Sequence, residues 1–131
     1  MWKEDGMEPK KETETKLKRY LRQKKSIENL RREILMLRES MHHPPSPEEA
    51  RALGDLIRRH ERATREVQAV EEALSYLREE DIHFLKTYYF VPRRLPMWKL
   101  ERELGMSERT IYRLRNQVLT TLCTLFYGEE E

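Results

Sequence analysis

Apolar residues in the first part of the chain recur with the spacing of an amphipathic helix. Between Thr15 and Met41, two positions of a seven-residue repeat are apolar, one holding Tyr20, Ile27, Ile34 and Met41 and the other Leu30 and Leu37. This spacing places a continuous apolar stripe on one side of a helix, as in a coiled coil. We therefore predict a helix over residues 15–41. Residues 1–13 show no such period, and we expect a disordered tail there.

A second apolar stripe begins after the proline-rich sequence HHPPSPEE. Ser46 is a suitable N-cap, Pro47 suits the first helical position, and Glu49 completes a capping box. From there apolar positions follow at intervals of three and four, which predicts a second helix over residues 47–79: Leu53, Leu56, His60, Ala63, Val67, Val70, Leu74 and Leu77. Two long helices joined by a short loop form an antiparallel hairpin. We expect residues 14–79 to form this coiled-coil-like unit.

The third part of the chain is divided into short helices by proline and glycine. DIHFLKTYYF is apolar nearly all round, which is typical of a short buried helix, and VPRRLP follows it as a linker. In the next segment, MWKLERELGM, Trp98, Leu100 and Leu104 are assigned to one face of a two-turn helix. Gly105 then stands where a helix ends in a left-handed backbone conformation.

The last predicted helix begins after that glycine. Ser107 is its N-cap, and its buried face is expected to hold Ile111, Leu114, Val118 and Leu122. Two helices joined by a short glycine turn form a helix-turn-helix. The predicted fold is therefore all-α, with the hairpin followed by a helix-turn-helix domain over residues 80–127 and an acidic tail over 128–131.

Charge is segregated along the chain although its formal net charge is only +2. Residues 14–41 carry nine Lys and Arg against four Glu, and residues 82–127 carry eight against three. Residues 47–81 are acidic, with six Arg against ten acids. A basic C-terminal module is typical of a protein that binds nucleic acid. The same charges are equally compatible with two solvated helix faces.

The outer face of the last helix suggests which residues would contact DNA. In the major groove, Arg pairs with guanine and Asn with adenine through two hydrogen bonds each. We assign base contacts to one set of residues on this helix: Arg109, Thr110, Tyr112, Arg113 and Asn116. We assign phosphate contacts to a second set, which includes the helix N-cap: Ser107, Arg115, Lys99, Arg102, Arg93 and Arg94. The competing interpretation is a helical hairpin with a solvated arginine face.

From Tyr76 to Phe126 the chain resembles region 4 of bacterial sigma factors. The matching parts are EDIHFLKTYYF and KLERELGMSERTIYRLRNQVLTTL, with LGMSERTIYR the most specific of them. The layout, a long helical part followed by this module, is similar to phage and prophage late-gene regulators of the RinA and ArpU type. The resemblance implies sequence-specific binding to double-stranded DNA and control of transcription, often of phage structural or lysis genes. In such a regulator we expect the hairpin to form a homodimer or to contact RNA polymerase. Glu101 departs from the family pattern, which has a small residue facing the turn.

Two other function classes are compatible with the sequence. One is a DNA-packaging subunit of the small-terminase type, although such subunits usually carry the DNA-binding module at the N-terminus. The other is a coiled-coil protein-interaction module, in which the coiled-coil surface is the active part and the basic stretch Lys16–Lys25 binds acidic protein or DNA. We expect no enzyme, cofactor or metal site, because the sequence has no phosphate-binding loop, no metal-ligand spacing and no placed nucleophile.

The remaining features concern location and two single residues. No apolar run approaches the roughly 20 residues that a membrane helix needs, and the first ten residues lack a signal core. With Cys123 as its one cysteine, the chain gives no sign of an oxidising compartment, and we expect it in the cytoplasm. We interpret Cys123 as a packed thiol and His60 as a core or interfacial histidine.

Overall fold

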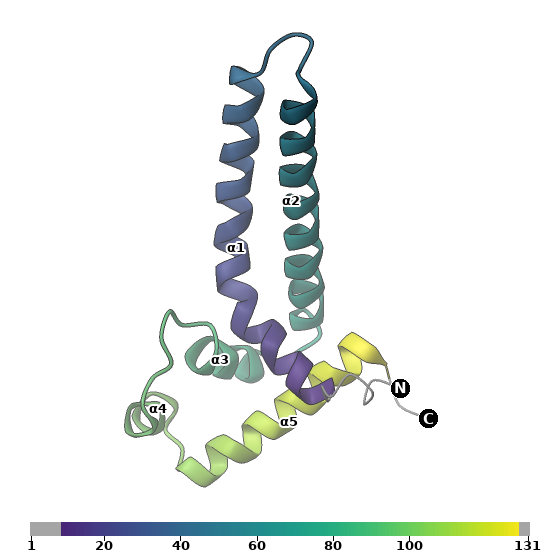
Figure 1. Cartoon of the computed structure of the whole chain (residues 1–131). Coiled ribbons are helices and arrows are strands. Elements are labelled where there is room, and N and C mark those ends of the chain that lie inside the picture. The colour runs from purple at the N-terminus through teal and green to yellow at the C-terminus, as the bar shows by residue number, and fades with distance from the viewer. Residues whose placement is uncertain (1–8, 129–131) are drawn as a thin grey trace. The chain divides into compact units, whose positions relative to one another are not determined.

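The computed structural model describes residues 9–128, and over this range the chain is all-helical, as predicted (Figure 1). The described residues contain no β-strand and form five helices, listed here in chain order: α1 (Pro9–Ser40), α2 (Pro47–Leu74), α3 (Glu79–Tyr88), α4 (Met97–Leu104) and α5 (Glu108–Tyr127). None of these helices is long and apolar enough to cross a membrane.

The contacts within the chain divide it into two compact units, and α1 and α2 each contribute to both. The two-helix unit is Arg22–Gln68. The five-helix unit consists of the described residues of Met1–Leu21 and Ala69–Glu131, so it contains the start of α1, the end of α2, and α3 to α5.

In the two-helix unit, the segments of α1 and α2 lie side by side and run in opposite directions (Figure 1). Leu30 on α1 and Ala63 and Val67 on α2 are buried, and most other members of the predicted stripes are half-buried. Outside the stripes, Leu35 and Met36 are largely exposed. The side-chain amide of Gln23 on α1 donates a hydrogen bond to Glu66 on α2.

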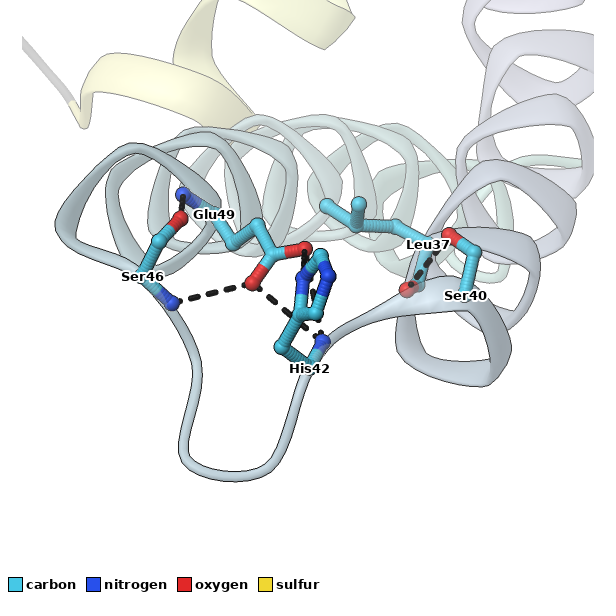
Figure 2. Close-up of polar contacts among 5 residues, drawn as sticks. All are labelled: Leu37, Ser40, His42, Ser46 and Glu49. Atoms are coloured by element: carbon cyan, nitrogen blue, oxygen red, sulfur yellow. Dashed lines mark hydrogen bonds and ion pairs between the residues drawn. The ribbon is translucent and has the colours of Figure 1, made fainter.

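The predicted capping box forms at the start of α2 (Figure 2). The Ser46 backbone N–H donates to Glu49 Oε1 at 2.9 Å, and the Glu49 N–H donates to Ser46 Oγ at 3.1 Å. Glu49 also reaches across the loop, because its Oε2 lies 2.9 Å from His42 Nδ1. The backbone N–H of Ser46 and the His42 ring lower the pKa of Glu49 to about 2. His42, in the loop before α2, therefore bonds to the cap.

Two predicted helix boundaries are wrong, for identifiable physical reasons. Residues 9–13, assigned to the tail, form the first turn of α1, because Thr13 is fully buried in the five-helix unit and its hydroxyl donates to the Pro9 carbonyl at 2.8 Å. The second helix ends at Leu74 rather than residue 79. There the Tyr76 and Leu77 N–H groups bond to carbonyls three residues back, which tightens and closes the helix. The other tail residues, 1–8 and 129–131, lie outside the described range.

The core of the five-helix unit is formed around α3. Phe84, Leu85, Tyr88 and Tyr89 are buried, as expected for the DIHFLKTYYF segment. Residues from the other helices complete this core: Leu17 and Tyr20 of α1, Val70 and Ala73 of α2, Leu100 of α4, and Ile111, Val118, Leu119 and Leu122 of α5. The start of α1 therefore belongs to the same core as the C-terminal helices, so burial of its apolar residues stabilises both.

Candidate functional site

The turn between α4 and α5 fixes the direction in which α5 leaves. Gly105 adopts φ 66° and ψ 35°, the left-handed conformation predicted from its position. Its N–H donates to the Glu101 carbonyl at 2.8 Å, and the Met106 N–H donates to the same oxygen at 3.3 Å. A residue with a Cβ pays a steric cost in this conformation, which explains a glycine at this position.

Two side chains satisfy backbone donors in the first turn of α5. The Thr110 N–H donates to Ser107 Oγ at 3.3 Å, which confirms the predicted N-cap. The Glu108 N–H donates to Glu101 Oε2 at 3.1 Å. Glu101 is thus accommodated without filling the turn, because its long side chain reaches past the turn to the start of α5. A carboxylate there is also favourable to the helix dipole.

The first three turns of α5 expose a basic and polar face. Arg109, Arg113 and Asn116 are exposed, Tyr112 is 43% exposed, and Thr110 is half-buried. After Glu108, no acidic residue occurs on α5. This face continues further along α5 than the sequence analysis assigned. Arg113 and Asn116 line a hollow of about 400 Å³ together with Gln117, Thr120 and Thr121. The four-residue spacing from Arg113 to Gln117 places both on one side of the helix and could have indicated this continuation.

Arg115 has a different environment from the other predicted phosphate contacts. Its Nη2 lies 2.9 Å from Glu14 Oε2 in an ion pair whose side chains are 26% and 16% exposed. Tyr89 donates its hydroxyl hydrogen to the same Glu14 oxygen at 2.6 Å. Arg115 also donates from Nη1 to Asn116 Oδ1 at 3.2 Å, so hydrogen bonds link the start of α1 to the exposed face of α5.

The electrostatics of this cluster favour a charged Glu14. Burial acts to raise the pKa of the Glu14 carboxyl, but hydrogen bonds from Tyr89 and Arg115 and the nearby positive charges outweigh it, so the pKa is lowered. Burial and the bond to Glu14 raise the pKa of the Tyr89 hydroxyl. Tyr89 is therefore a neutral donor, and Glu14 and Arg115 are both charged.

The remaining predicted phosphate contacts are all exposed. Ser107, Arg93, Arg94, Lys99 and Arg102 belong to this group. Arg94 lies over the buried Tyr88 ring, with 4.8 Å from its guanidinium carbon to the ring centroid. Arg102 lies 5.9 Å from the centroid of Trp98.

The assignment of Trp98 to the same face of α4 as Leu100 is wrong. Trp98 is 61% exposed, whereas Leu100 is 1% exposed. Successive helical residues are rotated by about 100°, so Trp98 and Leu100 point in nearly opposite directions. Trp98 therefore adds an exposed aromatic ring next to Arg102 rather than a core contact.

The described residues contain no group of three or more His, Cys, Asp or Glu side chains that could hold a metal ion. Cys123 is a half-buried thiol on α5. His60 is half-buried on α2, and its Nε2 is buried. Comparison with protein-family models, curated proteins and solved structures finds no match to this chain.

Proposed function

We propose that this chain is a sequence-specific DNA-binding regulator of transcription. The observation that carries the proposal is the exposed face of α5, which presents Arg109, Arg113 and Asn116 behind a capped N-terminus and a left-handed glycine. These are the side-chain types that pair with guanine and adenine edges in the major groove. In this proposal α4 and α5 act as a helix-turn-helix, with α5 as the recognition helix.

The remaining proposed DNA contacts lie around the exposed face of α5. Tyr112 and Thr110 flank the proposed base-contacting residues, and the five exposed phosphate contacts surround α4 and the turn. Arg115 is not one of these phosphate contacts, because its guanidinium is paired with Glu14. Its role in the proposal is to hold Asn116, whose side-chain oxygen it contacts.

The resemblance to sigma region 4 and to RinA- and ArpU-type regulators suggests the biological setting. We propose that the protein acts on bacterial or phage promoters in the cytoplasm, as an activator of late genes, with RNA polymerase as a further partner. The two-helix unit then serves for dimerisation or for polymerase contact. Leu35 and Met36 favour such a role, since they are 53% and 68% exposed on α1.

The test is a selection of bound sequences from a random DNA library at about 150 mM salt, which suppresses purely electrostatic binding. We expect an enriched motif. Two inverted copies spaced by about 10 base pairs would indicate a symmetric dimer, whereas a single asymmetric site would indicate a monomer acting beside polymerase. A protein that enriches no motif is not a sequence-specific regulator.

Substitution of the proposed base contacts makes the test specific to α5. The double variant Arg109→Ala with Arg113→Ala should lose about 1–3 kcal/mol of specific binding per arginine at the selected site. The charge-matched control is Arg59→Ala with Arg62→Ala, two exposed arginines of α2. Equal losses in the two variants would contradict base contact by α5.

A further inference from the structure

A hollow of about 210 Å³ in the five-helix unit brings together cations from two distant parts of the sequence. Lys18 of α1 and Arg94 of the linker after α3 line it, together with Tyr88, Tyr89 and Val91. No acidic residue is among these lining residues, so the hollow has two positive charges and no negative one. This combination favours an anionic group.

Arg94 is held in place by the aromatic core beneath it. Its guanidinium lies over the ring of Tyr88, which is 3% exposed and stacks against Phe84 with 5.3 Å between ring centroids. Stacking uses the flat face of a guanidinium and leaves its N–H donors at the edge for an acceptor. The stacking therefore orients Arg94 before any ligand binds.

The nearest acid on α1 is already paired. Glu14 lies one helical turn before Lys18, and the positive charge of Lys18 contributes to lowering the pKa of Glu14. Glu14 Oε2, however, accepts hydrogen bonds from both Tyr89 and Arg115. Because Arg115 balances the charge of Glu14, Lys18 and Arg94 retain a net attraction for an anion.

Lys16, two residues before Lys18, has different surroundings. The Lys16 ammonium lies 5.5 Å from the Phe126 ring centroid and 5.6 Å from that of Tyr127, at the far end of α5. Lys18, by contrast, shares its hollow with a cation that precedes α4 by only three residues. In a helix-turn-helix the first helix crosses the DNA backbone, so cations at its start lie beside phosphates.

We propose that the hollow between Lys18 and Arg94 binds a phosphate group of the DNA backbone. The inference rests on the proposed DNA binding and extends it, because it adds the first helix of the chain to the contact surface. Lys18 supplies a point charge and Arg94 supplies oriented N–H donors to the phosphate oxygens.

The experiment measures DNA affinity against salt concentration for the full chain and for Lys18→Gln with Arg94→Gln. Each phosphate contact that is lost reduces the slope of log K against log salt by about 0.9. Because both cations contact the same phosphate, we expect the double variant to lose about one unit of slope, and each single variant to lose a measurable part of it, on both the selected site and unrelated DNA. The preferred sequence should not change. The matched control, Lys25→Gln with Arg65→Gln, removes two exposed charges of the two-helix unit and should keep the original slope.

The outcomes separate this inference from the proposed function. If the unsubstituted protein binds no DNA, both fail. If it binds DNA and the Lys18 and Arg94 variants keep its slope, the phosphate site is wrong and the proposed function stands. A loss confined to the selected sequence would also overturn the inference, because it would indicate contact with bases. Each single variant removes one exposed charge, so the test does not depend on the folding of the double variant.

Discussion

The carboxylate of Glu14 connects the start of α1 to the C-terminal helices of the five-helix unit. Its Oε2 accepts hydrogen bonds from Tyr89, the residue that follows α3, and from Arg115 on α5. Tyr89 is 6% exposed and the Arg115 side chain 26%, so loss of the carboxylate charge weakens the hydrogen bonds of a buried phenol and a partly buried guanidinium. Weakening bonds at such sites costs more than an exposed ion pair contributes.

We predict that Glu14→Gln lowers the free energy of unfolding by about 1–3 kcal/mol at neutral pH, because a neutral amide replaces the charged acceptor. The effect should depend on pH. The pKa of Glu14 is lowered in the folded protein from its ordinary value of 4.5, so its stabilising contribution is complete above that value. It is lost as the pH falls through the lower folded-state pKa.

Urea unfolding of both proteins between pH 7 and pH 3 checks this prediction. The difference in unfolding free energy between them should be constant from pH 7 to about pH 5 and then shrink. Glu28→Gln, a substitution at an exposed position of the same helix, is the control and should change stability little. A difference that grows on acidification would show that the carboxylate is not stabilised by its partners.

At the scale of elements, the turn between α4 and α5 depends on one backbone conformation. Gly105 has φ 66°, and a Cβ built at this residue would meet no atom within 4 Å. Any cost of a side chain there is therefore conformational rather than a clash with neighbours. Gly54, in the middle of α2, presents the opposite case, since its backbone is helical and a Cβ would only reach Arg58 Nη1 at 3.4 Å.

We predict opposite signs for the same substitution at these two glycines. Gly105→Ala should destabilise the protein by about 1–2 kcal/mol, because alanine is strained in the left-handed region. Gly54→Ala should stabilise it by roughly 0.5–1 kcal/mol, because alanine loses less conformational entropy in a helix. Thermal and urea unfolding measure both variants. Destabilisation at both positions would contradict this account of the turn.

At the scale of the whole molecule, the C-terminal helices share their core with the start of the chain. Leu17 is fully buried and Tyr20 is 7% exposed, and both belong to the unit that contains α3, α4 and α5. Tyr20 also donates its hydroxyl hydrogen to Glu71 of α2 at 2.7 Å, and its ring lies 4.8 Å from that of Phe90. The candidate DNA-binding surface is thus supported by residues from both ends of the chain.

We predict that a fragment of residues 76–128 unfolds at a much lower temperature than the full chain, or without a cooperative transition. The fragment lacks Leu17, Tyr20 and Val70, and each fully buried large apolar side chain contributes roughly 1.5–3 kcal/mol. Circular dichroism during heating provides the measurement. A peptide of residues 9–26, added in trans, should raise the transition, whereas the same peptide with Leu17→Asp should not. A fragment as stable as the full chain would show that α1 is dispensable.

The sequence alone determined the helical class, the caps and much of the exposed face of α5. Apolar spacing, the Ser46–Glu49 box, Ser107 and Gly105 act through residues within a turn or two, and such local rules can be applied without coordinates. Helical geometry alone would also have shown that Trp98 and Leu100 lie on different faces of α4, since the angle between them follows from their positions in the sequence. Recognition of DNA by that face remains a prediction.

Only the tertiary structure decided which distant segments meet. It buried Thr13 and so extended α1 to Pro9, and it paired Arg115 with Glu14 instead of leaving it at the surface. It also placed Lys18 and Arg94 on one hollow. Contacts of this kind depend on how several apolar faces pack into one core. The packing determines which charged or polar groups at the edge of that core lie close enough to bond. No local spacing in the sequence contains that information.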